Sequence, residues 1–328
     1  MACAIALHRQ GYDIVGRHGI THLGERSRET YNPRMDDENA QVASRDIDPD
    51  VAAKVERLRD LLDGYGSALV AFSGGVDSTL VLKIGVDQLG DRCVAATGLS
   101  ASYAPEEMEE AKVVAAQLGA RHVMATTMEL TDPRYADNTH QRCFFCKSEL
   151  YTRLGVLAGE MGLATVVDGT NLDDTGDFRP GIRAGKQLGV RSPLVEAEIT
   201  KADVRAIAKA WALPTWDKPA AACLSSRFAY GDPITVEKLR RVSAAETALR
   251  ALGLRGFRVR HHGDIARLEI PADQMDSVME RRDEVARAVK AAGYAYVALD
   301  LDGFRSGSMN EVLDARVKSA GLRRPGPA

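Results

Sequence analysis

The sequence predicts an α/β protein in which a doubly wound parallel sheet is followed by a second, smaller α+β domain. Short apolar runs of strand length alternate with helical apolar spacing from about residue 50 onward, a pattern typical of strands covered by helices on both faces. A glycine-rich turn follows the first strand-like run and opens a helix. Beyond about residue 196 the pattern changes to two adjacent strands set between helices.

The composition is that of an ordinary globular protein. The chain has 328 residues, of which 45% are hydrophobic, and this length fits about two domains. Its 43 Lys and Arg residues against 46 Asp and Glu give a net charge of −3, which argues against a nucleic-acid partner. The longest apolar runs are only as long as strands and no targeting segment is evident, so we expect no membrane partner and a cytoplasmic location. Five cysteines are too few, and odd in number, for a disulfide scaffold.

The first domain is expected to span residues 50–195, after a mobile N-terminal extension at residues 1–49 that lacks a sustained apolar period. Its expected elements are, in order, a helix at 51–62, a strand at 67–72, a turn at 73–78, a helix at 79–89, a strand at 93–96, a helix at 105–118, a strand at 123–127, a helix at 143–161 and a strand at 164–167. Pro105 near the start and Gly119 after the end delimit the third of these helices.

The second domain is expected to span residues 196–312, followed by a flexible tail at 313–328. Its expected elements are a helix at 200–211, a loop at 212–235, a helix at 236–252, strands at 257–262 and 265–270, a helix at 274–291 and a strand at 295–301. The dipeptide Gly263-Asp264 between the two neighbouring strands predicts a hairpin turn.

The most specific motif is Ala71-Phe-Ser-Gly-Gly-Val-Asp-Ser78, between the first strand and its helix. The glycines allow a tight turn with exposed N–H groups, Ser73 and Ser78 add hydroxyl donors, and the helix directs its positive end to the same point. The motif predicts a pyrophosphate cradle, and it is not a Walker A loop because the Lys-Ser/Thr pair is absent. Asp77 would repel an anion unless it held Mg²⁺, so we expect magnesium there. A glycine turn without a ligand is the alternative.

The spacing of the cysteines points to a second site. Cys143 and Cys146 form a Cys-x-x-Cys pair at the expected start of a helix, and Cys223 lies in a loop rich in Pro and Ala. The positive end of that helix, with Arg142 and Lys147, is expected to stabilise the thiolates.

Several kinds of site remain open for these cysteines. Three cysteines with one open position fit a [4Fe–4S] cluster. A zinc site completed by His140, a redox dithiol at the Cys-x-x-Cys pair, and an ordinary buried Cys223 are the alternatives. Cys3 and Cys93 are expected to have no function.

The glycine turn resembles the PP-loop of ATP pyrophosphatases, which include GMP synthetase, NAD synthetase and tRNA thiolases. This resemblance implies a PP-loop (adenine nucleotide alpha hydrolase-like) domain that cleaves ATP between its α and β phosphates. Taken together, the motifs resemble the LarE family of ATP-dependent sulfur transferases over about residues 52–312. They are, in order, Ser73-Gly-Gly-Val-Asp-Ser78, Arg142-Cys-Phe-Phe-Cys-Lys147, Asp168-Gly-Thr-Asn171 with Asp174, Asp177 and Arg179-Pro-Gly181, residues 218–227, Arg258-Val-Arg260 and Gly303-Phe-Arg-Ser-Gly307.

The resemblance implies an activity and a set of cofactors. LarE proteins adenylate a carboxylate of pyridinium-3,5-biscarboxylic acid mononucleotide and convert it to a thiocarboxylate, in the biosynthesis of the nickel-pincer nucleotide cofactor. One class sacrifices a cysteine sulfur, and the other uses a [4Fe–4S] cluster held by three cysteines. The pattern here implies the cluster class, with Cys143, Cys146 and Cys223 as catalytic ligands, and sacrifice of Cys223 is the alternative. Implied cofactors and partners are ATP, Mg²⁺, the [4Fe–4S] cluster, a sulfide donor and further copies of the chain in a homo-oligomer.

Two groups of binding residues are expected. The ATP-binding residues are Ala71, Ser73, Gly74, Gly75, Asp77, Ser78, Gly98 and Gly169. The residues for the small nucleotide substrate are Ser226, Arg227, Arg258, Arg260, Asp174 and Glu246. The guanidinium groups suit a substrate phosphate, and Arg258 and Arg260 share one strand face because they are two residues apart. A solvated basic strand, and for Glu246 a solvated helix face, are the alternatives.

Three other functions remain open. A tRNA thiolase also joins a PP-loop to a three-cysteine cluster, but the net charge and the lack of further Cys-x-x-Cys pairs disfavour it. An amide-forming ATP pyrophosphatase would leave the three cysteines unexplained. A nucleotide-binding regulator with a structural zinc is the non-enzymatic alternative.

Overall fold

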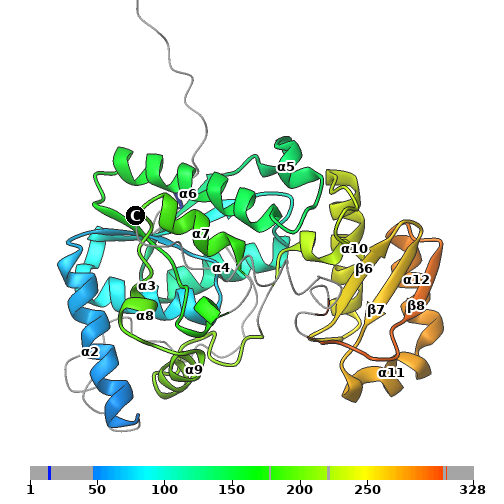
Figure 1. Cartoon of the computed structure of the whole chain (residues 1–328). Coiled ribbons are helices and arrows are strands. Elements are labelled where there is room, and N and C mark those ends of the chain that lie inside the picture. Colours follow the sequence, from blue (N-terminus) through cyan, green and yellow to red (C-terminus); the bar gives the residue numbers. More distant parts are fainter. Residues whose placement is uncertain (1–13, 16–46, 177–178, 220–221, 306–307, 309–328) are drawn as a thin grey trace, which may run out of the picture.

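The larger of two lobes is built on a five-stranded sheet, and the smaller on a three-stranded sheet (Figure 1). This computed structural model describes residues 14–15, 47–176, 179–219, 222–305 and 308. The large sheet has the order β1-β4-β3-β2-β5, and β2 to β5 run parallel. Its strands are β1 (Ile14–Val15), β2 (Ala68–Ala71), β3 (Cys93–Leu99), β4 (Arg121–Thr126) and β5 (Thr165–Val167). The expected class, a helix-flanked parallel sheet with a smaller second domain, is confirmed.

The strand β1 is a departure from the expected N-terminal extension. Ile14 and Val15 pair antiparallel with β4 at the edge of the sheet. A two-residue strand is too short to show a recognisable periodicity in the sequence. Its pairing partner also lies about a hundred residues away, so no local pattern indicates the pairing. The rest of the extension up to residue 46, and the tail at 313–328, lie outside the described residues.

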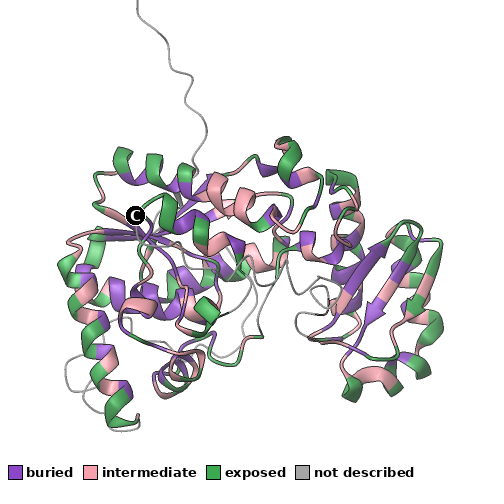
Figure 2. Ribbon diagram, viewed as in Figure 1, coloured by how far each residue is buried: buried purple, intermediate pink, exposed green. Residues whose placement is uncertain are grey.

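Helices cover both faces of the large sheet (Figure 1). Side chains of β2 alternate, so that Val70 packs with α2, α3 and α9 on one face while Leu69 packs with α6 on the other. The strands are accordingly buried along most of their length (Figure 2). The helices of this lobe are α2 (Pro49–Gly64), α3 (Val76–Leu89), α4 (Pro105–Gln117), α5 (Pro133–Ala136), α6 (Arg142–Glu160), α7 (Pro180–Gln187), α8 (Pro193–Glu196) and α9 (Lys201–Ala210).

The larger lobe continues beyond residue 195, where the sequence predicts a domain boundary. Leu194 of α8, Ile207 of α9 and Leu213 are fully buried in the same core as β2 and α3. An amphipathic pattern shows which face of a helix is apolar, but it does not show which core receives that face. Helix α9 therefore belongs to the larger lobe and not to the second domain, where the sequence predicts it.

The smaller lobe packs three helices against a mixed sheet of order β6-β7-β8. Its elements are α10 (Val236–Ala251), β6 (Arg258–His262), β7 (Ile265–Glu269), α11 (Met275–Glu280), α12 (Arg282–Ala291) and β8 (Tyr296–Leu299). Gly263 makes the hairpin turn between β6 and β7 with a φ of +61°. The single helix expected at 274–291 is broken at Arg281, whose Nη1 donates to the carbonyl oxygen of Leu252 at 2.9 Å. This distant contact explains why the sequence gives no sign of the break.

An apolar cluster and backbone hydrogen bonds join the two lobes. Tyr135 of the larger lobe is buried in one cluster with Phe228 and with Val242 of α10. The N–H of Ile234 donates to the carbonyl oxygen of Ala136 at 2.8 Å. The segment that leads into the smaller lobe is thus held along the α5–α6 connection. No helix in the described part of the chain is both long and apolar enough to span a bilayer.

His122 of β4 makes stability sensitive to acid. It is buried beside Thr97, whose Oγ1 lies 2.8 Å from its Nε2, and its ring meets the edge of Phe72. Burial lowers the pKa of His122 to about 4, with a smaller contribution from the charge of Lys112. Between pH 6.5 and 4 the unfolded chain therefore binds a proton that the folded chain does not, and unfolding becomes easier as the pH falls.

We expect this single group to reduce the free energy of unfolding by about 3 kcal/mol between pH 6.5 and 4. Urea unfolding measured across this range should show a steeper loss of stability in the wild type than in His122→Gln, which cannot bind the proton. Equal pH slopes in the two proteins would contradict the prediction.

Candidate active site

The turn at residues 73–78, after β2, is held together by contacts of its own serine hydroxyl groups. The Oγ atoms of Ser73 and Ser78 lie 3.1 Å apart, and Ser78 Oγ donates to the carbonyl oxygen of Gly75 at 3.1 Å. Gly74 has a φ of +67°, and a Cβ there would lie 3.0 Å from the Cβ of Ala111 on α4. Gly75 is the N-cap of α3 and makes no side-chain cap, so the first amides of the helix are left for a ligand. The turn has the form expected of a phosphate cradle.

The loop after β5 lies directly against this turn. A Cβ on Gly169 would lie 2.7 Å from the backbone nitrogen of Ser78, so the two backbones touch there. Because β2 lies between β3 and β5, this is the point at which the strand order reverses, where open α/β sheets bind ligands. Ala71, the last residue of β2, leads into it. Gly98 near the end of β3 serves packing, since a Cβ there would lie 3.0 Å from Leu150 of α6.

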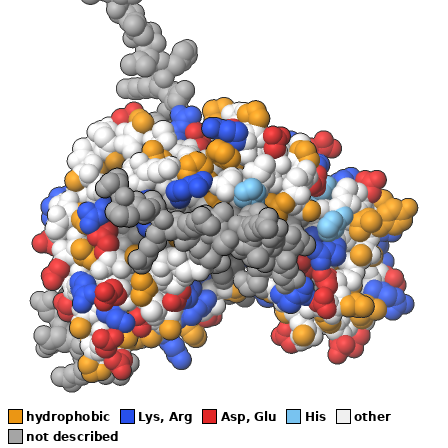
Figure 3. All heavy atoms as spheres, viewed as in Figure 1, with side chains coloured by type: hydrophobic (Ala, Val, Ile, Leu, Met, Phe, Trp, Pro, Cys, Tyr) orange, Lys and Arg blue, Asp and Glu red, His pale blue; other side chains and the backbone are white. Residues whose placement is uncertain are grey.

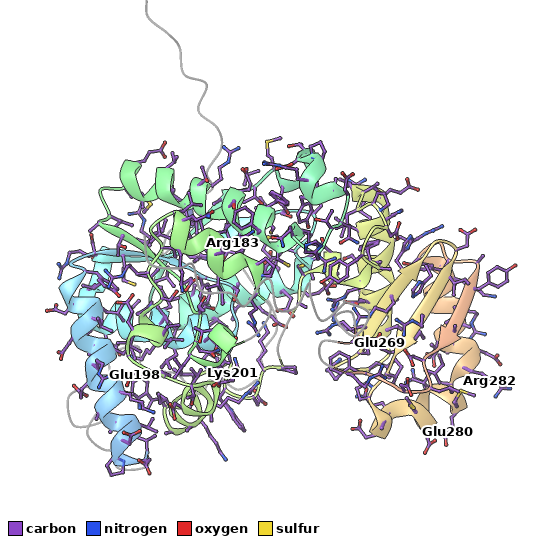
Figure 4. The ribbon with its side chains drawn as sticks, viewed as in Figure 1. Arg183, Glu198, Lys201, Glu269, Glu280 and Arg282 are labelled. Atoms are coloured by element: carbon purple, nitrogen blue, oxygen red, sulfur yellow. The ribbon has the colours of Figure 1, made fainter. Side chains whose placement is uncertain are left out.

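Asp77, in the first turn of α3, is bound by side chains from two other segments. Its Oδ2 accepts from Nζ of Lys201, the first residue of α9 (Figure 4), and its Oδ1 accepts from Nδ2 of Asn171 at 3.1 Å. Lys201 thus supplies the positive charge that the sequence analysis expected from Mg²⁺. Asp174 pairs with Arg179 at 2.8 Å, and burial, with a smaller contribution from the charge of Asp77, raises the pKa of its carboxyl.

The three cysteines lie on two segments that are bonded to each other. Cys143 and Cys146 lie at the start of α6, and Cys223 directly precedes the short 3-10 helix η4 (Leu224–Arg227). Tyr135 of α5 and Ser225 of η4 are both buried, and their hydroxyl oxygens lie 2.5 Å apart. This contact links the segment before α6 to the residues that follow Cys223.

Asn138 forms a second link between these segments. It is fully buried, with a φ of +53°, in the turn between α5 and α6. Its Nδ2 donates to the carbonyl oxygens of Ala229 at 2.7 Å and Asp232 at 3.0 Å, while its own carbonyl accepts from the N–H of Gly231 at 3.0 Å. Its Oδ1 accepts from Nη1 of Arg142. One side chain thus orients both the start of α6 and the chain after η4.

The surroundings of the thiols raise their pKa values. Protein packed around the two thiols raises the pKa values of Cys143 and Cys146, although Cys143 as a whole residue remains exposed, and the charge of Cys223 adds to the effect. Arg142 and Lys147 act in the opposite direction on Cys143 but do not outweigh it. The two cations thus favour the thiolate of Cys143, as expected, but the net shift of its pKa is upward.

The three thiols influence one another but do not form a closed metal site. Cys143 and Cys223 are exposed, Cys146 is half-buried, and all three are free thiols. Within the described ranges, no three His, Cys, Asp or Glu side chains are grouped so that they could hold a metal ion. Neither the zinc site with His140 nor a closed set of three cysteines is formed in this arrangement.

Arg227 and Glu246 form a buried ion pair behind Cys223. Nε and Nη2 of Arg227 donate to the two carboxylate oxygens of Glu246 at 2.8 and 2.9 Å. Nη1 of Arg227 donates to the carbonyl oxygens of Ala222 and Cys223 at 2.7 and 3.1 Å. Glu246 is fully buried, so the solvated helix face considered for it is wrong. Both residues, expected to contact substrate, instead position the backbone of Cys223.

Arg258 and Arg260 of β6 have different surroundings. Arg260 is buried, and its Nη atoms donate to the carbonyl oxygen of Ser226 and to Glu269, each at 2.6 Å. Its Nε has no hydrogen-bond partner among the described residues. Arg258 is half-buried, and burial, together with the charge of Arg227 and Arg260, lowers its pKa to about 10. Positive charge is therefore concentrated beside Ser226, and a solvated basic strand is excluded.

Basic and acidic side chains are interspersed over the face of the molecule in Figure 3. No continuous stripe of Lys and Arg crosses the described atoms of that face. This distribution gives no support to a nucleic-acid partner on that face.

Comparison with known proteins identifies the family. The profile of the NAD synthase family matches residues 51–152, which carry the phosphate turn. A pyridinium-3,5-bisthiocarboxylic acid mononucleotide synthase from Lactiplantibacillus plantarum is 42% identical over 265 residues, which cover 80% of this chain and 96% of that protein. The chain belongs to the LarE family.

Two further relatives show the extent of the match. An uncharacterized protein from Synechocystis sp. is 47% identical over 80% of this chain and 98% of its own length. Another from Methanocaldococcus jannaschii is 28% identical over 73% of this chain and 90% of its own length. These relatives match this LarE protein over nearly their full lengths.

Three residues that shape this site carry no signal in the sequence. Lys201 binds Asp77, while Tyr135 and Asn138 fasten the Cys223 segment to the start of α6. Each acts on a residue far away in the sequence, so no local spacing could have indicated its role.

Substitution of Glu246 should destabilise the fold strongly. Glu246→Gln leaves the buried guanidinium of Arg227 without its counter-charge, and we expect a loss of about 3–5 kcal/mol in urea unfolding. Glu237→Gln, on the exposed face of the same helix, is the matched control and should change little. A double replacement of Arg227 and Glu246 by Met should recover much of the loss, and no recovery would contradict an ion-pair origin.

Substitution of Gly169 should weaken ATP binding. Gly169→Ala places a Cβ against the backbone of Ser78 and forces the phosphate turn to shift, so we expect at least about a tenfold loss of ATP affinity by calorimetry. Gly64→Ala, where a Cβ meets nothing within 4 Å, is the control. Unchanged affinity in Gly169→Ala would show that the turn does not bind the nucleotide.

Proposed function

We propose that this protein is an ATP-dependent sulfur transferase. It adenylates a carboxylate of pyridinium-3,5-biscarboxylic acid mononucleotide and converts it to a thiocarboxylate. Membership of the LarE family, and the printed name of the Lactiplantibacillus relative as a synthase of the bisthiocarboxylic acid, support this substrate and product.

The observation that carries the proposal is a loop that contacts both the phosphate turn and the segment of Cys223. In residues 100–103, after β3, Tyr103 Oη donates to the carbonyl oxygen of Ser73 in the phosphate turn at 2.6 Å. The carbonyl oxygen of Ser102 accepts from the N–H of Leu224, next to Cys223, at 2.9 Å. A carboxylate activated at the turn is thereby kept near the sulfur site. Holding the two reacting groups close together lowers the entropic cost of their reaction.

The turn supplies the activation step. The carboxylate oxygen of the substrate attacks the α-phosphorus of ATP, and pyrophosphate leaves into the amides at the start of α3 and the hydroxyls of Ser73 and Ser78. The sulfur nucleophile then displaces AMP from the acyl carbon. Mg²⁺ would accompany ATP, and Asp77 becomes available to it when Lys201 turns toward the phosphates.

We propose that Cys143, Cys146 and Cys223 are the ligands of a [4Fe–4S] cluster. The soft thiolate donors suit iron–sulfur chemistry, and Arg142 beside them has a buried Nε without a partner among the described residues, as suits an anionic group. When bound, the cluster supplies a deprotonated sulfide. The chain must bring Cys223 closer to α6 to complete the site. The second candidate for the sulfur source is Cys223 itself, which would give up its sulfur atom. Its exposure and the hydrogen bond from Arg227 to its carbonyl oxygen favour this alternative.

The substrate phosphate is proposed to bind at Ser226, Arg258 and Arg260. The depressed pKa of Arg258 supports this, because burial and the nearby charges of Arg227 and Arg260 disfavour its charged form, and a bound anion would stabilise that form. Arg227 and Glu246 hold this group in place. Asp174 borders the phosphate turn and is proposed to contact the substrate from that side.

Its setting in the cell is also a proposal. We infer a cytoplasmic homo-oligomer supplied by a sulfide donor. Tyr296 of β8 and Leu301 beyond it are 66% and 89% exposed, and such apolar side chains near a free sheet edge support contact with another chain.

The test separates adenylation from sulfur transfer. Cys143→Ser, assayed anaerobically with ATP and the biscarboxylic mononucleotide, should still form AMP and pyrophosphate but no thiocarboxylate. Cys93→Ser, which alters a buried cysteine of β3, is the control and should keep both activities.

Metal and mass analysis decide between the sulfur sources. Iron and sulfide in anaerobically purified protein are expected, and zinc without iron would contradict the cluster. Loss of H₂S from Cys223 after turnover, seen by mass spectrometry, would establish sacrifice of that cysteine instead.

A further inference from the structure

A buried guanidinium lies among the cysteines without a carboxylate partner in the described part of the chain. Arg142, the first residue of α6, is only 5% exposed. Its Nη1 donates to Oδ1 of Asn138, and its guanidinium lies 5.3 Å from the centre of the Tyr230 ring. Its Nε is buried and meets no hydrogen-bond acceptor among the described residues. A neutral amide and an aromatic ring do not neutralise a buried charge. Among the described residues, Arg142 therefore lacks a counter-ion.

Arg142 directly precedes Cys143 at the start of α6. The first turn of α6 has no acidic residue, and the positive end of the helix adds to the same potential.

We propose that Arg142 is the fixed cation of an anion-binding site at the three cysteines, and that the anion is the sulfur to be transferred. The identity of the anion rests on the proposed function, whereas the existence of the site does not. A guanidinium keeps its charge at all relevant pH values and offers several donors, so it can hold a sulfide or thiolate without a proton.

Asn138 is the positioning residue of this site. Its Oδ1 takes up one donor of Arg142, and its Nδ2 is fixed by two carbonyl oxygens of the chain after η4. The guanidinium of Arg142 is therefore held in place at the start of α6, next to Cys143 in the chain. Glu129 lies on the side of Cys146 and raises the pKa of that thiol. The positive potential should therefore be stronger at Cys143 than at Cys146.

The test uses two alkylating reagents of similar size, the anion iodoacetate and the neutral iodoacetamide. The thiolate of a given cysteine attacks both reagents. The exposure of that cysteine and its thiolate fraction therefore affect both rate constants equally and cancel in their ratio, which reports the local electrostatic potential. The full-length chain is isolated without iron, and each cysteine is followed by mass spectrometry. We expect the ratio at Cys143 in the native protein to exceed the ratio at the same cysteine in denaturant by about tenfold or more, as one charge-assisted hydrogen bond would give.

Variants assign this preference to Arg142. In Arg142→Gln the ratio should fall to the denatured value, while Arg142→Lys should keep part of it. Arg153→Gln removes the same charge from a half-buried site later in the same helix, where Arg153 pairs with Glu149 at 3.0 Å, and should leave the ratio unchanged. Equal ratios in native and denatured wild type, a comparison that needs no variant, would overturn the proposal. So would an unchanged ratio in an Arg142→Gln protein that still shows cooperative thermal unfolding.

A second arm distinguishes a cluster from free sulfide as the source of the anion. After reconstitution with iron and sulfide, the midpoint potential should be more negative in Arg142→Gln than in wild type and unchanged in Arg153→Gln, because loss of a nearby cation disfavours the reduced cluster. An unchanged potential in Arg142→Gln would assign the cation to free sulfide. The alkylation ratios are measured without ATP, substrate or cluster. A negative result there would not contradict the proposed function. In turn, a protein that fails to transfer sulfur could still show the predicted ratios.

Discussion

The buried carboxylate of Glu246 is the group on which the arrangement around Cys223 depends. It lies on α10, binds Arg227 of η4 with both oxygens, and accepts the N–H of Val259 in β6 at 3.1 Å. One charge thus joins a helix, a strand and the cysteine segment. Attraction by Arg227 and hydrogen bonding lower its pKa although burial acts in the opposite direction, so the carboxylate stays ionised. Arg227 can then hold the carbonyl oxygens of Ala222 and Cys223.

The second constraint is the contact between the lobes. The clamp formed by Tyr135 and Asn138 sets where Cys223 lies relative to α6, and residues 100–103 set where it lies relative to the phosphate turn. These contacts use buried hydroxyl, amide and backbone groups, whose geometry is more narrowly defined than that of apolar packing. The sulfur site is therefore a product of the interface between the lobes. Neither lobe contains all of its residues.

Charge is distributed differently at the two ends of this site. At the phosphate turn, Asp77 and Lys201 neutralise each other, and the helix amides are left as the attraction for an anion. Near Cys223, the three arginines Arg227, Arg258 and Arg260 lie with two buried carboxylates, Glu246 and Glu269, and Arg142 directly precedes Cys143. Both ends favour anions, as expected for an ATP-dependent enzyme that acts on a small nucleotide.

Sequence alone determined the parallel sheet and the glycine turn between β2 and α3, because both follow from local periodicity or from motif spacing. The grouping of the three cysteines stays a prediction. The sequence could not determine that α9 completes the core of the larger lobe, that Arg281 breaks a helix, or that Lys201 binds Asp77. It also assigned Arg227 and Glu246 to the substrate, whereas the fold buries them against each other. Residue types and spacing define what a side chain can bind, but its actual partner depends on which distant segments pack against it. Only the tertiary structure decides that, because burial and charge pairing arise from contacts between segments remote in the chain.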